Sequence, residues 1–128
     1  MSAASDYLEN KLLDHTLGNT AFTQPSSLFV GLYTSSPGDD DSGTECSGGA
    51  YARQSASFAA ASGGSCATDA TITFPAATSN WGTITHVSVH DASSSGNLLF
   101  HGAVTSSKTI ETGDTFQISS GNLTITLA

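Results

Sequence analysis

Charged side chains are scarce in this sequence, and basic ones are the scarcest. Only 11% of the 128 residues are charged, and three Lys and Arg stand against eleven Asp and Glu, which gives a formal net charge of −8. Nucleic acids and anionic membrane surfaces are bound by clusters of Lys and Arg, so this balance argues against both as partners. No apolar run approaches the roughly 20 residues of a membrane span.

Leader-like features and cysteine pairs are missing as well. The first residues, MSAASD, lack the basic and apolar regions of a signal peptide, so we expect synthesis in a cytosol without a cleaved leader. The two cysteines, Cys46 and Cys66, form no C-x-x-C pair, which excludes zinc-ribbon and thioredoxin motifs. They are either loop thiols that never meet or a disulfide that forms under oxidising conditions, which would contribute roughly 3 kcal/mol.

Small hydroxyl residues take the place of the missing charges, and one segment stands apart from them. The chain holds 21 Ser and 17 Thr beside 13 Gly, residue types that favour strands and turns. Residues 6–17 show a helical pattern instead, in which Asp6 is placed as an N-cap and Glu9 follows three residues later. Gly18 then provides a stop signal. We therefore predict one N-terminal α-helix over about 6–17.

The apolar face of this helix needs a docking partner. Leu8 and Leu12 belong to a set of four leucines within one half of the helical wheel. A helix of this length is marginal on its own in water. Its apolar face packs either on the chain's own sheet or on a partner subunit, and both alternatives stay open.

From residue 27 onward the pattern has the period of two that is typical of strands. Turn signals rich in Gly, Ser, Pro and Asn separate the segments. The alternation predicts sheets with one buried and one wet face. We predict a mainly β, single-domain antiparallel β-sandwich over residues 1–128, jelly-roll-like, with seven or eight strands. The predicted strand segments are 27–34, 51–58, 71–76, 83–92, 98–105, 109–119 and 123–127, of which 51–58 has a weak pattern.

No arrangement of residues predicts a metal site, a cofactor or catalysis. His86 and His90 share one face of a predicted strand but lie about 13 Å apart by the rise per residue, too far for one ion. The predicted hairpin allows His101 to stand beside either of them, which would give a pair of histidines. Asp39, Asp40 and Asp41 do not fit the EF-hand spacing and are expected to form a solvated acidic loop. We therefore predict a non-enzymatic protein.

What remains is a weakly charged, hydroxyl-rich surface that suits contacts with other subunits. Trp81 lies between turn signals, where it serves either as a lid over one end of the sandwich or as an interface anchor. The histidines are expected on a polar face or at a subunit contact. The candidate interface residues are Leu8, Leu12, Tyr51, Trp81, His86 and His90.

Three blocks of the sequence carry a resemblance to a known family. They are YARQ (51–54), FPAATSNWGT (74–83) and NLLFHGA (97–103). With them, nearly the whole chain resembles a family of small tailed-bacteriophage virion proteins, usually labelled tail fibre proteins. The resemblance implies a virion component made in the host bacterial cytoplasm, with no catalytic residues and no cofactor. Cys46, Cys66 and His90 depart from the residues usual in that family.

Two roles fit this resemblance. The first is a capsid decoration (cement) protein that binds the major capsid protein of the assembled shell as an oligomer, a homotrimer in our prediction, and stabilises it. The second is a tail fibre or tail-tip component that contacts tail proteins and takes part in host-surface attachment. Fibres usually show long repetitive shafts, and none occurs in this sequence. The sequence therefore favours decoration and keeps the tail fibre as the alternative.

Overall fold

The computed structural model describes residues 3–127, which form one helix and nine short strands. This confirms a mainly β chain with one N-terminal helix. Among these residues no helix is long and apolar enough to cross a membrane. In chain order the elements are β1 (Ala3–Ala4), α1 (Asp6–Thr16), β2 (Phe29–Tyr33), β3 (Gln54–Ser55), β4 (Ser65–Ala67), β5 (Ile72–Thr73), β6 (Gly82–His90), β7 (Leu98–Ile110), β8 (Gln117–Ile118) and β9 (Thr124–Thr126).

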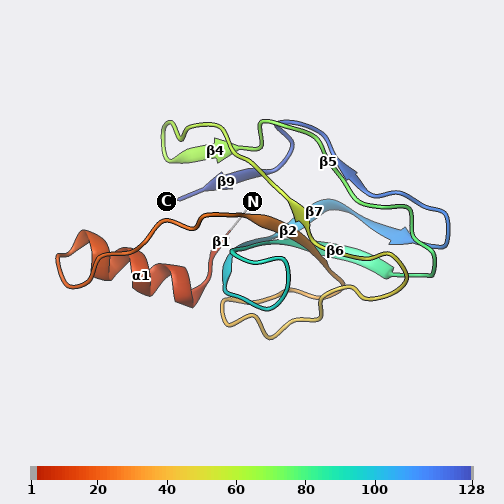
Figure 1. Cartoon of the computed structure of the whole chain (residues 1–128), viewed down its shortest axis with the longest axis horizontal. Coiled ribbons are helices and arrows are strands. Elements are labelled where there is room, and N and C mark those ends of the chain that lie inside the picture. The colour runs from red at the N-terminus through yellow and green to blue at the C-terminus, as the bar shows by residue number, and fades with distance from the viewer. Residues whose placement is uncertain (1–2, 128) are drawn as a thin grey trace.

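The strands form one large antiparallel sheet and two small ones. The main sheet has the order β1-β7-β6-β2-β3, and β4–β9 and β5–β8 form separate two-stranded ribbons. In Figure 1 the β4–β9 ribbon lies above the main sheet, and the 34–50 loop runs below it. The predicted hairpin is present as β6 and β7. The jelly-roll topology is not confirmed, because the strands outside the main sheet form two separate two-stranded ribbons.

The N-cap of helix α1 lies one residue before the position that the sequence suggested. The N-cap is Ser5, whose Oγ accepts a hydrogen bond from Leu8 N at 3.2 Å, and not Asp6. The Ser5 hydroxyl also donates to the carbonyl of Leu98, so the cap ties the helix start to β7. Gly18 ends the helix as predicted, with a φ of +83° that glycine adopts without strain.

The core lies between the main sheet and the two ribbons. Strand β6 supplies its centre, and its second half is buried on both faces. The predicted wet face of this strand is therefore wrong there, because the chain's own 34–50 loop covers it. The fully buried hydrophobic residues at the centre are Val30, Leu32, Ile84 and Ile110.

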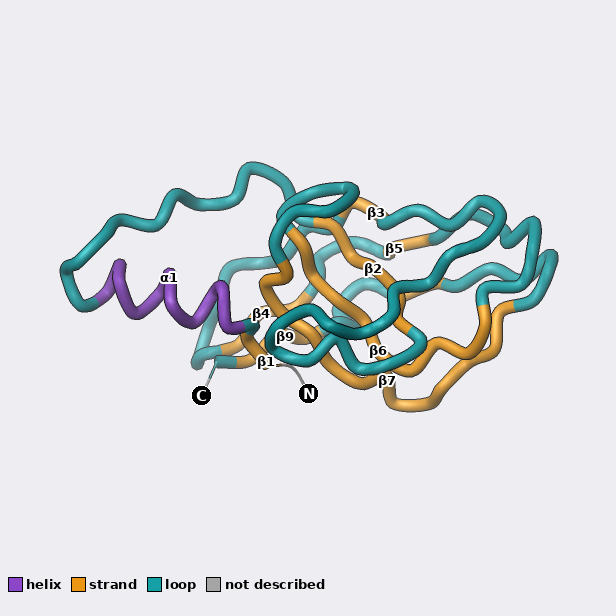
Figure 2. The backbone as a smooth tube through the Cα atoms, turned by 90° about the horizontal axis from the view of Figure 1, so that it is seen from below, coloured by secondary structure: helices purple, strands orange, loops and turns teal. Residues whose placement is uncertain are grey.

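Helix α1 and the segment that follows it extend beyond the β layers at one end of the molecule (Figure 2). The helix contributes one buried residue to the core, Leu8, which is 5% exposed, and Leu12 packs at the edge of the core. The chain then returns to β2 through mostly exposed residues. We call residues 6–28 the arm.

Candidate functional site

A partly buried cluster of polar side chains joins the 34–50 loop to one face of the main sheet. The Tyr33 hydroxyl donates to Asp41 Oδ1 at 2.7 Å. The other oxygen of Asp41 lies 3.3 Å from His90 Nε2, and His90 Nδ1 lies 3.0 Å from Ser88 Oγ. The rings of Tyr33 and His90 stack with their centroids 6.3 Å apart. Because β2 and β6 are neighbours in the sheet, these residues meet although they are far apart in sequence.

Glu45 is the second centre of this cluster. Its two carboxylate oxygens accept hydrogen bonds from Arg53 Nε and one terminal nitrogen, each at 2.9 Å. The Tyr51 hydroxyl donates to the same carboxylate at 2.6 Å and accepts from Leu32 N at 3.0 Å. The remaining Arg53 nitrogen donates to two carbonyls of the 91–97 turn, at 3.0 and 2.8 Å. The pair therefore joins two loops to the main sheet.

The pKa values in the cluster follow from burial and from these bonds. Burial acts to raise the pKa of Glu45, but the hydrogen bonds from Arg53 and Tyr51 outweigh it and hold that pKa below its usual value. Burial raises the pKa of Tyr33, and the bond to Asp41 adds to the effect. For His90, burial and the nearby Arg53 charge lower the pKa despite the contact with Asp41. At neutral pH the cluster therefore contains ionised Glu45 and neutral His90.

Ser88, His90 and Asp41 form a hydrogen-bonded series that resembles a hydrolytic triad in composition. Ser88 and His90 are both 0% exposed, and neither lines a cavity described below. A substrate has no access to the serine oxygen in this structure. A glycine, Gly31, makes room for the series: a Cβ there would lie 2.8 Å from Ser88 Oγ and 2.9 Å from Glu45 Oε2. The arrangement holds the loop to the sheet.

The candidate interface residues do not lie on one surface. Leu8, Trp81 and His90 are 5%, 4% and 0% exposed. They expose almost no side-chain area in this structure, and an interface role for them stays a prediction. Trp81 Nε1 donates to the Gly49 carbonyl at 2.9 Å, and its ring packs edge-on against Tyr51. Burial of a tryptophan with its N–H bonded is typical of a core position.

The other candidates are only half-buried. Leu12 packs at the edge of the core, and Tyr51 contributes its hydroxyl to the Glu45 cluster. His86 is also half-buried, with its Nδ1 2.8 Å from the hydroxyl of Thr85. An interface role for these three stays a prediction. His101 stands beside neither His86 nor His90, because the β6–β7 register places it opposite Ser88.

The acidic loop is exposed at all three aspartates, as the sequence suggested, but two of them also contact other parts of the fold. Asp39 Oδ1 lies 2.8 Å from His101 Nε2, Asp40 accepts from Ser42 N, and Asp41 belongs to the His90 cluster. Carboxylate oxygens of Asp6, Glu9 and Asp39 come within 4.8 Å of one another, and all three residues are exposed. Two of the three aspartates thus bind neighbouring side chains across the fold.

Cys46 and Cys66 are free thiols in the structure. Cys46 is buried in the 34–50 loop, where its N–H donates to the Leu32 carbonyl at 2.8 Å. Burial and the neighbouring Glu45 charge raise the pKa of Cys46 to about 11. Cys66 lies on β4, paired with Ile125 of β9. Cys46 belongs to the hydrophobic core and Cys66 packs against it, and no bond joins the two thiols in this structure. A disulfide formed under oxidising conditions stays a prediction.

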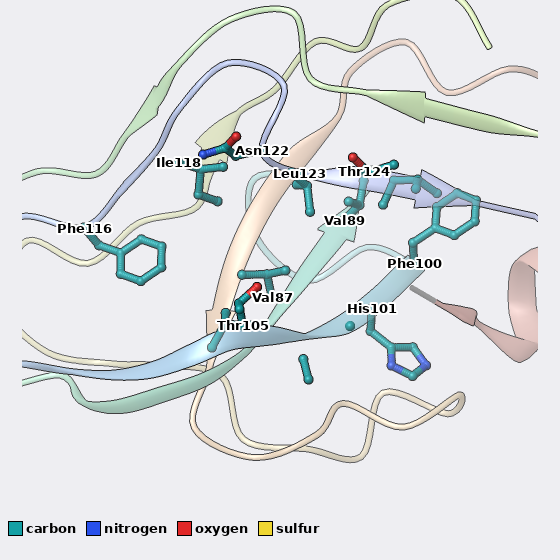
Figure 3. Close-up of a pocket in the computed structure, with 14 residues that line it drawn as sticks. Val87, Val89, Phe100, His101, Thr105, Phe116, Ile118, Asn122, Leu123 and Thr124 are labelled. Atoms are coloured by element: carbon teal, nitrogen blue, oxygen red, sulfur yellow. The ribbon is translucent and has the colours of Figure 1, made fainter. Parts of the chain in front are cut away.

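Two cavities lie on the ribbon side of the main sheet. The larger has a volume of about 310 Å³ and opens between β7 and β9, and Figure 3 shows Val87, Val89, Phe100, Leu123 and Thr124 around it. The second has about 250 Å³. We call this second cavity the apolar cleft; its lining is Leu28, Phe58, Ala61, Gly64, Ser65, Cys66, Val89, Leu99, Phe100, Ile125 and Leu127.

Sequence reasoning missed the polar cluster around Asp41 and Glu45. The only available signal was Arg53, one of three basic residues in the chain, inside an alternating segment. The two cavities could not be found from the sequence, because they depend on how the layers meet.

The comparisons with known proteins agree with a virion role. No curated protein matches the chain. The model of one family, described as podophage GP4 fiber I protein gp80, matches residues 3–126. That match covers almost every residue and gives a structural phage fibre family, and hence a virion component. The chain therefore belongs to the podophage fiber I protein family.

Proposed function

We propose that this chain is a non-enzymatic component of the phage tail that forms part of a fibre and takes part in host-surface attachment. The observation that carries the proposal is membership of a fibre family over residues 3–126. The partners would be tail proteins and further copies of this chain, with a homotrimer as the proposed assembly. The burial of Ser88 and His90 supports the absence of catalysis, because the serine has no path to a substrate.

The lengths of the strands support a proposal about where in such a fibre the chain lies. Its strands are two to thirteen residues long and show no repeated unit, so the chain does not resemble a shaft. It suits a short module at the base or tip of the fibre. A module of this kind would act by binding neighbouring proteins of the fibre. The two cavities on the ribbon side of the main sheet are candidate sites for such binding.

Capsid decoration remains the second candidate, and two observations favour it. The chain has no shaft, and its net charge of −8 suits an outer surface away from packaged DNA. In that role the chain would bind the major capsid protein and stabilise the assembled shell through preferential binding. The two candidates differ strongly in the number of copies per particle.

The test is the copy number of this chain in purified virions. Quantitative mass spectrometry would compare its peptides with those of the major capsid protein and of a tail protein of known stoichiometry. A few to a few dozen copies would support the tail fibre. Hundreds of copies, near one per shell subunit, would overturn it in favour of decoration. Gold-labelled antibody on intact particles provides an independent check of position.

A further inference from the structure

We propose that the arm of one copy docks head-to-tail into the apolar cleft of a second copy, with Leu13 and Leu17 as anchors. This inference deepens the proposed self-association and rests on it. The contact does not depend on whether the protein lies on the tail or on the capsid. The arm–cleft contact and the proposed position on the tail can therefore fail separately.

The anchors are unusual on this surface. The large hydrophobic residues exposed among residues 3–127 are Leu13, Leu17 and Leu127, at 56%, 78% and 51%. Leu13 and Leu17 are four residues apart, so they lie on the same side of the arm. Leu127 lines the apolar cleft. The exposed hydrophobic area is thus divided between a projecting arm and the lining of a hollow.

The arm is braced internally although it extends away from the sheets (Figure 2). His15 Nδ1 accepts a hydrogen bond from Phe22 N at 3.0 Å, and the Tyr7 and Phe22 rings meet edge-on with centroids 6.5 Å apart. Asn19 N donates to the Asp14 carbonyl at 2.8 Å. These contacts hold the returning chain to the helix. A preformed arm loses little conformational entropy on docking, which favours binding.

The apolar cleft fits such an anchor in size and chemistry. Its volume is about 250 Å³, whereas a dry cavity of roughly 150 Å³ is already large enough to bind benzene. It therefore has room for a leucine side chain. No charged residue lines it, and Ser65 is its one hydroxyl-bearing lining residue. A leucine entering this hollow leaves water without burying an unpaired charge.

The chain itself carries both halves of such a contact, an exposed leucine pair on the arm and an uncharged apolar cleft, which favours a second copy as the occupant. Because no carboxylate lines the cleft, the arm of a second acidic copy meets no like charge there. The arm spans residues 6–28, and its residues after Leu12 are mostly exposed. A knob and a hole on different surfaces of one chain give a head-to-tail contact, which can close into a ring such as a trimer.

The experiment uses the full chain and two variants that disable opposite halves of the contact. The double variant Leu13→Gln with Leu17→Gln removes the anchors, and Ala61→Trp fills the cleft at an exposed lining residue. Thr20→Gln on the arm and Ala60→Trp beside the cleft are the matched controls. Circular dichroism and thermal unfolding verify that each variant folds. Sedimentation velocity over a concentration series gives the oligomeric state.

We expect the wild type and both controls to self-associate. The anchor variant and the cleft variant should each weaken association by at least about a hundredfold, since each removes the burial of leucine side chains. An equal mixture of the two variants should then form a heterodimer, because the intact arm of Ala61→Trp still fits the intact cleft of the anchor variant.

Three results would overturn the inference. A wild type that stays monomeric at every concentration would remove self-association itself, whatever the copy number in virions. Association that survives in both variants would place the contact on another surface and leave the proposed function untouched. Loss of association in the anchor variant alone, with Ala61→Trp still oligomeric, would indicate that arms pair with arms.

Discussion

The two sides of the main sheet are closed by different physical means. On the loop side, the 34–50 loop is held by the polar cluster of Tyr33, Asp41, Glu45, Arg53 and His90, and no buried side-chain polar atom among residues 3–127 lacks a hydrogen-bond partner. On the ribbon side, β4–β9 and β5–β8 pack through apolar side chains and leave cavities of about 310 and 250 Å³.

The two kinds of contact differ in how closely they fix the position of the covering segment on the sheet. Hydrogen bonds are directional, so a loop that must satisfy buried polar groups has one position available. Apolar contacts are not directional, so short ribbons can rest on the sheet without filling the space between them. The loop side is therefore expected to resist substitution, and the ribbon side to accept both added volume and a partner.

The largest effect is expected from Arg53→Leu on the loop side. This change leaves the half-buried Glu45 carboxylate without its partner and removes the donors to the Ala92 and Ser95 carbonyls. Breaking a buried ion pair costs 3–5 kcal/mol, and we expect about 3 kcal/mol here because Glu45 keeps some contact with water. Chemical denaturation measures it. A loss similar to that of Lys108→Leu, an exposed control, would contradict the structural role of the pair.

Labelling of the two cysteines allows the accessibility of the 34–50 loop and of the apolar cleft to be compared. Burial raises the pKa of Cys46 from 9.0 to about 11, so at pH 8 its reactive thiolate is about a hundredfold rarer than without that shift. Cys66 lines the apolar cleft and is only half-buried. A thiol reagent should label Cys66 first, as measured by mass spectrometry of tryptic peptides. Equal labelling rates in the native protein would show that the loop side opens as readily as the ribbon side.

Gly31→Ala introduces one methyl group beneath the loop. The new Cβ would lie 2.8 Å from Ser88 Oγ, 2.9 Å from Glu45 Oε2 and 3.3 Å from the Tyr51 hydroxyl. Because these groups are held by one another, we expect a loss of about 2 kcal/mol, within the range for overpacking. The unfolding free energy measures the loss. No destabilisation would mean that the cluster can shift without penalty.

Acid should weaken the loop side through His90. Its folded-state pKa lies below the unfolded value of about 6.5, because burial and Arg53 disfavour the charged form. The unfolded state therefore binds the proton more readily, and the stability contributed by neutral His90 is lost as pH falls from that value through the folded pKa. Thermal unfolding between pH 7 and 5 should show the decline. In His90→Asn the slope over this window should be smaller, and an unchanged slope would assign it to other groups.

Val89→Ile is the ribbon-side counterpart of Gly31→Ala and should have the smallest effect. Val89 is 3% exposed and lines both cavities, so the added methyl group has space to occupy. We expect a change within about 1 kcal/mol, with stabilisation the favoured sign. The same denaturation experiment measures it. A loss as large as that of Gly31→Ala would mean that the two sides are packed alike.

Local sequence signals predicted the elements that depend on neighbouring residues. The helix over 6–17 with its stop at Gly18, the buried strand within 27–34 and the hairpin of β6 and β7 all follow from apolar spacing and turn residues. The N-cap was misplaced by one residue because Ser5 and Asp6 are both good caps. Ser5 is selected by its second bond, to Leu98, which is distant in the chain.

The candidate sites were harder to predict because their residues come from separate segments. His90 was expected on a polar or subunit-facing surface, and it is buried by Asp41, which lies 49 residues away in sequence. Trp81 is covered through Gly49, 32 residues away. Alternation along one strand shows which residues share a face, but it does not show what covers that face.

The amino-acid sequence by itself determined the class of this chain: mainly β with an N-terminal helix, acidic, and with no repeat pattern within its 128 residues. Its composition, its periodicity and its matching blocks are local properties that need no folding to be present. Only the tertiary structure decided which polar residues are buried, where the thiols lie, and that an exposed apolar arm and an uncharged apolar cleft occur on the same chain. Those features depend on loops and ribbons that pack across the sheet. Such contacts join residues far apart in the sequence, so no single segment predicts them.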